Sequence, residues 1–313
     1  MLVLTDVDAD RIASQRARDE FFWLDLEDPS FEEMRRAGEQ LGLHPVALED
    51  THEWHQRPKI DSYGDYVLLV LYSARMSSAD EAIPLEVHVY LSGSYVLTVR
   101  REPCTGLDKL HADLAEAPLD DEGKLVYRIL DTLTDAWYPV IQGLERRIDA
   151  LEDQVLLRAR REHLREIYRL RQEVRALWRI GTVQSDHRHE VAEAIRDLPG
   201  LSQDTRAWLR DVGDHLVQIA AELSRQNDDL AALTATYFNA NADRLNAVAT
   251  RLTVIGTLFV VATIVTGFFG QNFGWLVHHI NTPGEFLVWG VGVPLVLLCA
   301  AGAILWIKRR DLF

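Results

Sequence analysis

The chain has 313 residues and a formal net charge of −15 at pH 7. This acidic balance argues against nucleic-acid binding, because phosphate recognition requires a basic surface. It suits the attraction of cations, but ordinary solubility explains most of the carboxylates better. Two cysteines are too few for a disulfide framework. The first residues show neither a basic leader nor an apolar core of the signal-peptide type. We therefore expect a large N-terminal part in a reducing cytosol.

Residues 1–118 are expected to form a cytosolic α/β domain. The run 85–91 alternates apolar and polar residues, which predicts a strand with one buried face. Ser92-Gly93-Ser94 predicts a hairpin after it, and the spacing of Ser30 and Glu33 predicts a helix that opens with a capping box. A second helix is expected after His44-Pro45. Strand-length runs occur at residues 2–4, 21–26, 66–72, 85–91 and 95–99.

This N-terminal part shows no arrangement typical of an enzyme. It has no glycine-rich phosphate loop and no serine nucleophile elbow. His52 and His55 stand three residues apart but lack a catalytic glutamate pattern, which favours ordinary histidines over a metal site. We expect a protein that is not an enzyme and that holds no cofactor.

From residue 119 onward, apolar residues recur at steps of three and four, which predicts long helices. One helix is expected to run to about residue 155 with a kink at Pro139. A second is expected over residues 160–196, with Trp178 on its buried side and His187 and His189 as surface histidines. Arginines on its other face alternate with glutamates, which favours a solvated or acid-paired face over a nucleic-acid or lipid surface.

Leu198-Pro199-Gly200 predicts a break, after which no proline occurs between Ser202 and Phe269. A continuous helix over that stretch would be about 100 Å long at 1.5 Å per residue. Such a helix is too long for a compact globule, and its first part is too polar to cross lipid. We therefore expect residues 119–250 to form a long-helix stalk that joins the N-terminal domain to a membrane.

Two C-terminal apolar runs are long enough to cross a bilayer. Membrane helices are predicted at residues 251–272 and 286–308, with an external loop at 273–285 and a cytosolic tail at 309–313. The loop has no lysine or arginine, whereas Lys308, Arg309 and Arg310 follow the second run. The positive-inside rule therefore predicts a multi-pass protein of the cell (inner or plasma) membrane with both termini in the cytosol.

Small and polar residues share one face of the first predicted membrane helix, and Asn246 and Asn272 stand at the two ends of this face. Small residues alone would fit close helix packing equally well. A carboxamide oxygen, however, can face a hydrated cation without the desolvation cost of a carboxylate, so the asparagines favour a polar path. Because two helices enclose no pore, such a path needs several copies of the chain around an axis.

The first predicted membrane helix ends in the tripeptide Gly270-Gln271-Asn272. Four further segments stand out, namely Leu48-Glu49-Asp50, Arg57-Pro58-Lys59-Ile60, Trp137-Tyr138-Pro139 and residues 246–253. Together with the long stalk and the two membrane helices, these segments resemble the CorA family of divalent-cation channels. The resemblance covers essentially the whole chain and implies an α+β fold and a homopentameric funnel, with a pore made by five copies of the first membrane helix.

The resemblance also implies roles for single residues. Asn272 would form the filter at the outer mouth together with Gly270 and Gln271. Asn246 would form a ring on the cytosolic side, and Asn272 and Asn246 would hold the metal ion through its water shell. The remaining expected pore residues are Thr263, a polar ring, and Leu252 and Val260, an apolar gate.

Two departures from the family pattern concern selectivity and regulation. Gln271 replaces the methionine of the usual Gly-Met-Asn tripeptide, which leaves the ion preference open. Ala235 stands where some members carry a regulatory acidic residue, and Asp228 and Asp229 nearby are the regulatory candidates.

The expected function is passive influx of a divalent cation, most of all Mg²⁺ and also Co²⁺ or Ni²⁺, driven by the membrane potential. The expected partners are further copies of the chain, the lipid bilayer and the transported ion, and no nucleic acid. A zinc transporter similar to ZntB is an alternative, since His278 and His279 in the loop would suit zinc or nickel. An alternative from another class is a membrane-anchored signalling or scaffold protein, against which stand the paired asparagines and the short tail.

Overall fold

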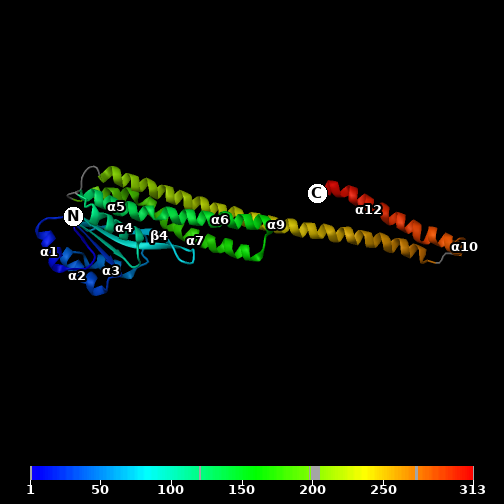
Figure 1. Cartoon of the computed structure of the whole chain (residues 1–313), viewed down its shortest axis with the longest axis horizontal. Coiled ribbons are helices and arrows are strands. Elements are labelled where there is room, and N and C mark those ends of the chain that lie inside the picture. Colours follow the sequence, from blue (N-terminus) through cyan, green and yellow to red (C-terminus); the bar gives the residue numbers. More distant parts are fainter. Residues whose placement is uncertain (1, 120, 197, 199–204, 272–273, 313) are drawn as a thin grey trace. The chain divides into compact units, whose positions relative to one another are not determined.

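The computed structural model describes residues 2–119, 121–196, 198, 205–271 and 274–312. The chain divides into two compact units, Met1–Thr236 and Tyr237–Phe313, and helix α9 (Thr205–Phe269) contributes to both. The first unit combines a sheet with helices, and the second is helical (Figure 1). The predicted α+β class with a long helix and apolar C-terminal helices is confirmed. The finer boundaries at residues 118 and 250 stay predictions.

A six-stranded mixed sheet with the order β1-β2-β6-β5-β4-β3 forms the centre of the first unit. β1, β2 and β6 run parallel, whereas β6, β5, β4 and β3 are antiparallel neighbours. All five predicted strands are present, and the predicted hairpin joins β5 to β6. β3 was not predicted because its four residues, KIDS, carry two charges. The strands are β1 (Leu2–Leu4), β2 (Phe22–Glu27), β3 (Lys59–Ser62), β4 (Tyr66–Met76), β5 (Ala82–Ser92) and β6 (Tyr95–Arg100).

One face of the sheet is covered by α1 (Ala9–Ala17), α2 (Phe31–Leu41) and α3 (Pro45–Glu53). Ile12, Met34 and Ala47 from these helices share one apolar core with Leu68 and Leu97 of the sheet. The predicted capping box opens α2: the Ser30 side chain accepts the backbone N–H of Glu33, and the Glu33 carboxylate accepts that of Ser30. α1 was not predicted, since it buries Ile12 alone in an otherwise polar segment.

The opposite face packs against α4 (Thr105–Glu116), α5 (Glu122–Asp135), α8 (Arg188–Arg196) and the first part of α9. The expectation that residues 85–91 expose one face is wrong, because every one of them is buried. Val87 and Val89 lie in the core beneath α5, while His88 and Tyr90 face α3, where Thr51 hydrogen-bonds both. The sheet is therefore covered on both sides.

The long helices are divided more often than predicted. The helix expected over residues 119–155 consists of α5 and α6 (Trp137–Arg158), which are separated at Ala136. Pro139 explains the interruption, because it has no N–H for the carbonyl of Asp135 and its ring crowds that group. The helix expected over residues 160–196 is divided at His187 into α7 (Arg161–Asp186) and α8, and Trp178, predicted to be buried, is 36% exposed.

The second unit contains the end of α9, then α10 (Gly274–His279), α11 (Pro283–Glu285), the π-helix η1 (Phe286–Gly292) and α12 (Val293–Leu312). The segment expected to be a simple loop thus holds two short helices. The predicted second membrane helix starts as a π-helix, in which Val293 N–H donates to the carbonyl of Val288. Pro294 follows directly, and the wider turn relieves the clash of its ring with the preceding turn.

Two helices of the described chain are long and apolar enough to cross a membrane, within Ala207–Phe268 and within Pro283–Ile304. Apart from Leu198, the predicted break at Leu198-Pro199-Gly200 and the predicted helix start at Ser202 lie outside the described residues. The described part of α9 begins at Thr205.

Candidate functional site

The face of α9 predicted to line a pore is uncovered within one chain. Asn246 and Thr263 are exposed, and Leu252 and Val260 are 64% and 57% exposed. The covered positions of the same segment follow steps of three and four and lie roughly half a turn away around the helix. These covered positions are Leu258, Val261, Ala262 and Val265.

The glycines on the predicted pore face do not serve packing inside the chain. A Cβ added at Gly256 or at Gly267 would meet no atom within 4 Å. Small residues are therefore not required there by a neighbouring helix of the same chain. These small residues can instead serve contacts between copies of the chain or line a polar path.

The threonine hydroxyls of this segment are bound to the helix itself. The Thr263 hydroxyl donates to the carbonyl of Phe259 at 2.8 Å, and Thr253 and Thr257 donate to carbonyls four residues back in the same way. Because each hydrogen is used in this bond, the remaining lone pairs of each oxygen can accept from water. An exposed Thr263 thus offers an acceptor to the water shell of a cation.

α9 ends where the predicted filter tripeptide begins. The N–H of Gly270 donates to the carbonyl of Thr266 at 2.9 Å, and the N–H of Gln271 donates to that of Phe268 at 3.3 Å. A Cβ at Gly270 would lie 3.3 Å from the Thr266 oxygen, which is tight enough to favour glycine. Gln271 is exposed, and Asn272 lies outside the described residues, so its filter role stays a prediction.

The predicted regulatory aspartates differ in their surroundings. Asp229 accepts a hydrogen bond from Arg225 at 2.8 Å, and the same guanidinium binds Glu145 at 2.8 Å. Asp228 is exposed on the surface of α9. Asp229 would therefore have to exchange Arg225 for a metal ion.

A group of potential metal ligands that the sequence did not suggest joins α5 to α9. Asp131, Asp135 and His215 each present a ligand atom, and these atoms lie within 4.8 Å of one another. His215 Nδ1 is 3.8 Å from an oxygen of either aspartate. Burial raises the pKa of Asp131, and the charge of Asp135 raises it further. The i,i+4 aspartates were visible in the sequence, but their approach to a residue of α9 was not.

The histidines considered in the sequence are engaged in structural contacts. The His52 ring packs edge-on against the Phe31 ring, with 5.3 Å between the ring centroids. The backbone N–H of His55 donates to the Glu86 carboxylate. In the part of the chain that the structure describes, neither joins a group of three potential metal ligands. His187, expected on the surface, is half-buried and hydrogen-bonds Glu190 at 2.6 Å.

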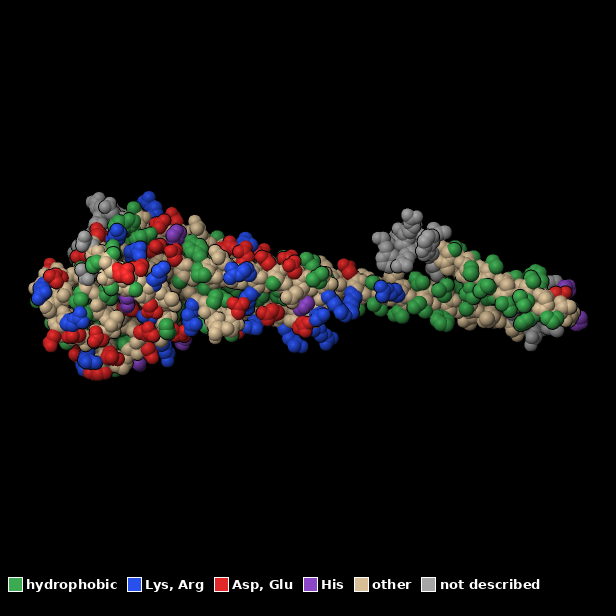
Figure 2. All heavy atoms as spheres, viewed as in Figure 1, with side chains coloured by type: hydrophobic (Ala, Val, Ile, Leu, Met, Phe, Trp, Pro, Cys, Tyr) green, Lys and Arg blue, Asp and Glu red, His purple; other side chains and the backbone are tan. Residues whose placement is uncertain are grey.

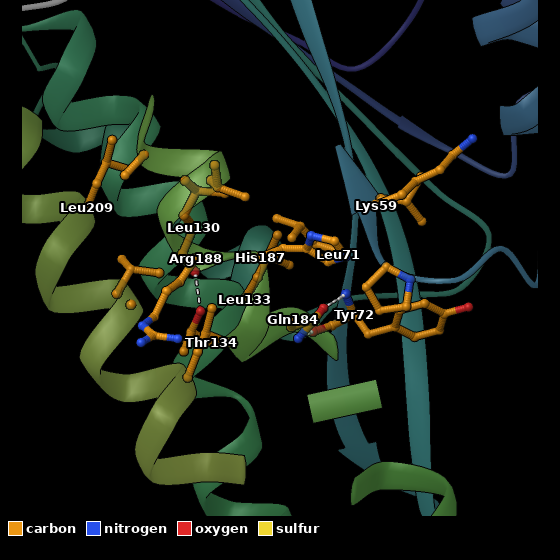
Figure 3. A pocket seen from close by; sticks show the side chains of 17 residues that line it. Lys59, Leu71, Tyr72, Leu130, Leu133, Thr134, Gln184, His187, Arg188 and Leu209 are labelled. Carbon is orange, nitrogen blue, oxygen red and sulfur yellow. Dashed lines mark hydrogen bonds between the residues drawn. The ribbon is translucent and has the colours of Figure 1, made fainter. Parts of the chain in front are cut away.

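A small cavity lies between the sheet edge and the helices of the first unit (Figure 3). Leu71, Leu130 and Leu209 make most of its wall apolar, and its volume is about 40 Å³. That volume has room for a few water molecules at most, since each needs about 10–15 Å³ of such space. The cavity is therefore a packing feature and not a ligand site.

Comparison with known proteins identifies the family. The family model described as "CorA-like Mg2+ transporter protein" matches residues 18–309. The "Cobalt/magnesium transport protein CorA" of Thermotoga maritima is 27% identical over 279 residues, covering 84% of this chain and 74% of that protein. The "Zinc transport protein ZntB" of Pectobacterium carotovorum is 24% identical over 255 residues, covering 81% and 76%.

The fold agrees with a solved member of the same group. The complete structure of the CorA magnesium transporter from Methanocaldococcus jannaschii superposes with a TM-score of 0.77 at 21% identity, covering 92% of this chain and 90% of that one. With two helices able to cross a bilayer, the chain is a membrane protein. It belongs to the CorA-like Mg²⁺ transporter family.

Proposed function

We propose that five copies of this chain form a channel for hydrated divalent cations, with Mg²⁺ as the main ion and Co²⁺ and Ni²⁺ as further ones. The observation that carries the proposal is the uncovered face of α9, where Asn246, Leu252, Val260 and Thr263 are exposed opposite the covered stripe. When the copies place this face around a common axis, the same residue from each copy contributes to one ring. The ion is cargo, and no cofactor is required.

Transport in this proposal is passive. Mg²⁺ gives up its water reluctantly, so neutral oxygens of Asn272 and Asn246 would hold the ion through its hydration shell. A negative-inside potential drives a divalent cation inward with about 4.6 kcal/mol per 100 mV. The apolar rings at Leu252 and Val260 would close the path by excluding water. Both termini would lie in the cytosol, and Asp228 and Asp229 remain regulatory candidates.

Replacing the filter asparagine tests the proposal. Asn272→Ala removes one carboxamide from each subunit, so Mg²⁺ uptake into proteoliposomes should be lost while light scattering still reports the mass of the intact assembly. Asn281→Ala removes a carboxamide from the adjacent segment and should leave uptake unchanged. Normal uptake by the Asn272 variant would refute the filter assignment. Loss of uptake in both variants would show that uptake does not depend on Asn272 in particular.

A zinc transporter is the second candidate, favoured by the match to a zinc transport protein and by the two exposed histidines at the end of α10, His278 and His279. Imidazole suits Zn²⁺ and Ni²⁺ better than it suits Mg²⁺. Parallel flux measurements with Mg²⁺, Co²⁺, Ni²⁺ and Zn²⁺ separate the two candidates. If Zn²⁺ is preferred and His278→Ala with His279→Ala removes that preference, zinc is the physiological ion. The absence of flux for every ion would instead support the signalling or scaffold alternative.

A further inference from the structure

The turn between α6 and α7 is the most exposed apolar point of the first unit. We define the α6–α7 tip as residues 156–165. Leu156 and Leu157 are 62% and 86% exposed at the end of α6, whereas Val155 beside them is fully buried. Only two residues separate the end of α6 from the start of α7, so this end of the helix pair is compact. Two adjacent exposed leucines on such a tip call for an apolar or amphipathic partner.

The same tip is basic in an acidic protein. It carries four arginines and one glutamate, although the whole chain has a net charge of −15. Glu162 pairs with Arg160 at 3.0 Å. Among the described residues, Arg158, Arg161 and Arg165 form no ion pair, whereas Arg169 further along α7 binds Glu81 at 2.7 Å. Figure 2 shows basic side chains gathered over this end of α6 and α7.

The start of α7 adds positive potential. Its N-cap residue, Arg160, makes no side-chain cap hydrogen bond, although the N–H of His163 donates to the carbonyl of Arg160 at 3.1 Å. No side chain of the cap therefore compensates the positive end of the helix dipole. Arg161, Arg165 and Tyr168 follow steps of four and three on one face, and Tyr168 is exposed. Arginine and tyrosine together are typical of the interface between water and lipid headgroups.

The tip lies at the end of the first unit at which that unit's part of α9 ends. α6 runs parallel to α9, because Tyr138 donates to Gln218 and Glu145, further along α6, pairs with Arg225, further along α9. Residue numbers therefore rise together on the two helices. The tip is at the end of the unit where α9 leaves it after Thr236.

We propose that the α6–α7 tip binds anionic lipid headgroups, with Leu156 and Leu157 entering the interface and Arg158, Arg161 and Arg165 facing the phosphates. Anionic lipid combines an apolar layer with a sheet of negative charge, which matches the leucines and arginines of the tip. The contact would anchor the first unit and couple it to lipid composition.

The test uses full-length protein in liposomes with a fluorophore on Leu157→Cys and with Cys299→Ala to remove the exposed thiol. Brominated phosphatidylglycerol should quench this label more strongly than the same fraction of brominated phosphatidylcholine does. Salt at 1 M, where the Debye length is about 3 Å, should abolish the difference. A label on Val46→Cys of α3 should show no difference between the lipids.

A second experiment removes positive charge from the α6–α7 tip. The triple variant Arg158→Gln, Arg161→Gln, Arg165→Gln should lose the difference in quenching. A matched variant that neutralises three exposed arginines elsewhere in the unit should keep it: Arg11→Gln, Arg18→Gln, Arg36→Gln. Equal quenching by both lipids, or none by either, would overturn the proposal. So would a label that is equally shielded in detergent, since another protein copy would then cover the tip.

Discussion

Glu86 is the most densely bound carboxylate of the sheet. One oxygen accepts from His88 Nε2 at 2.8 Å and from the backbone N–H of Gln56 at 3.2 Å, and the other accepts from the Tyr72 hydroxyl at 3.0 Å and from the N–H of His55. Burial alone would raise the pKa of Glu86, but these bonds outweigh it and lower the pKa below its usual value. They also hold His55 at a φ of 59°, in the left-handed region that a non-glycine residue seldom adopts.

Replacing this carboxylate should destabilise the first unit in a pH-dependent way. A lowered pKa in the folded state stabilises the fold above the unfolded pKa of about 4.3, and this stabilisation is lost as the pH falls through the folded pKa. Glu86→Gln should therefore cost about 2 kcal/mol at pH 7, the scale of a hydrogen bond to a charged group. Thermal unfolding from pH 7 to pH 3.5 or so should show the difference shrinking as Glu86 becomes protonated.

The control for this experiment is Glu116→Gln, an exposed glutamate in the last turn of α4. It should leave the midpoint of unfolding unchanged at every pH. A loss of stability in Glu86→Gln that is equal at both ends of the pH range would show that packing, and not the charge, causes it.

At the scale of elements, a side chain completes the edge of the sheet. β3 pairs with β4 only as far as Val70, so the backbone of Tyr72 has no strand beside it on that edge. Gln184 of α7 takes that place: its carbonyl accepts the N–H of Tyr72, and its amide donates to the carbonyl of Tyr72 at 3.2 Å (Figure 3). Trp137 Nε1 donates to the same carbonyl at 2.9 Å. The junction of α6, α7 and the sheet is fixed in this way.

Gln184→Ala should consequently loosen α7 from the sheet. It leaves the half-buried N–H of Tyr72 without a protein acceptor, which costs about 1 kcal/mol, the low end of the range for a fully buried group. Gln172→Ala, on an exposed position of the same helix, is the matched control and should cost far less. Hydrogen exchange at Tyr72 is the direct measurement, since the variant should exchange this amide faster. Unchanged protection of the Tyr72 amide would mean that a water molecule accepts its hydrogen bond in place of the Gln184 side chain.

The helices and strands that were predicted correctly are those whose own residues determine their secondary structure. The apolar runs of the strands and the pairing of Ser30 with Glu33 are local signals, and both were predicted. β3 and α1 were missed because their burial depends on neighbours supplied by the rest of the fold. The contact of Gln184 with Tyr72 joins residues 112 positions apart and leaves no local pattern. The same holds for the approach of His215 to Asp131, so that part of the candidate site could not be predicted.

At the scale of the whole molecule, the proposed path requires several copies of one face of α9. Two described helices cannot enclose a path, and the stripe that contains Leu252 and Val260 is uncovered in the single chain. Periodicity predicted this stripe from the sequence, because helical spacing alone decides which residues share a face. The number of copies has no such local signal and rests on the family resemblance.

A polar substitution in the proposed apolar gate should therefore increase ion flow. Val260→Asn would place a ring of carboxamides where we expect water to be excluded, so the closed state should hydrate and leak. We expect a several-fold rise in Mg²⁺ flux into proteoliposomes at equal protein content. Val254→Asn makes the same change on a different face of the same helix and should leave flux near the unmodified level. Because both variants bring the same polar group into the membrane, a shared loss of assembly would affect them alike. Equal flux from the two would mean that Val260 does not line the constriction.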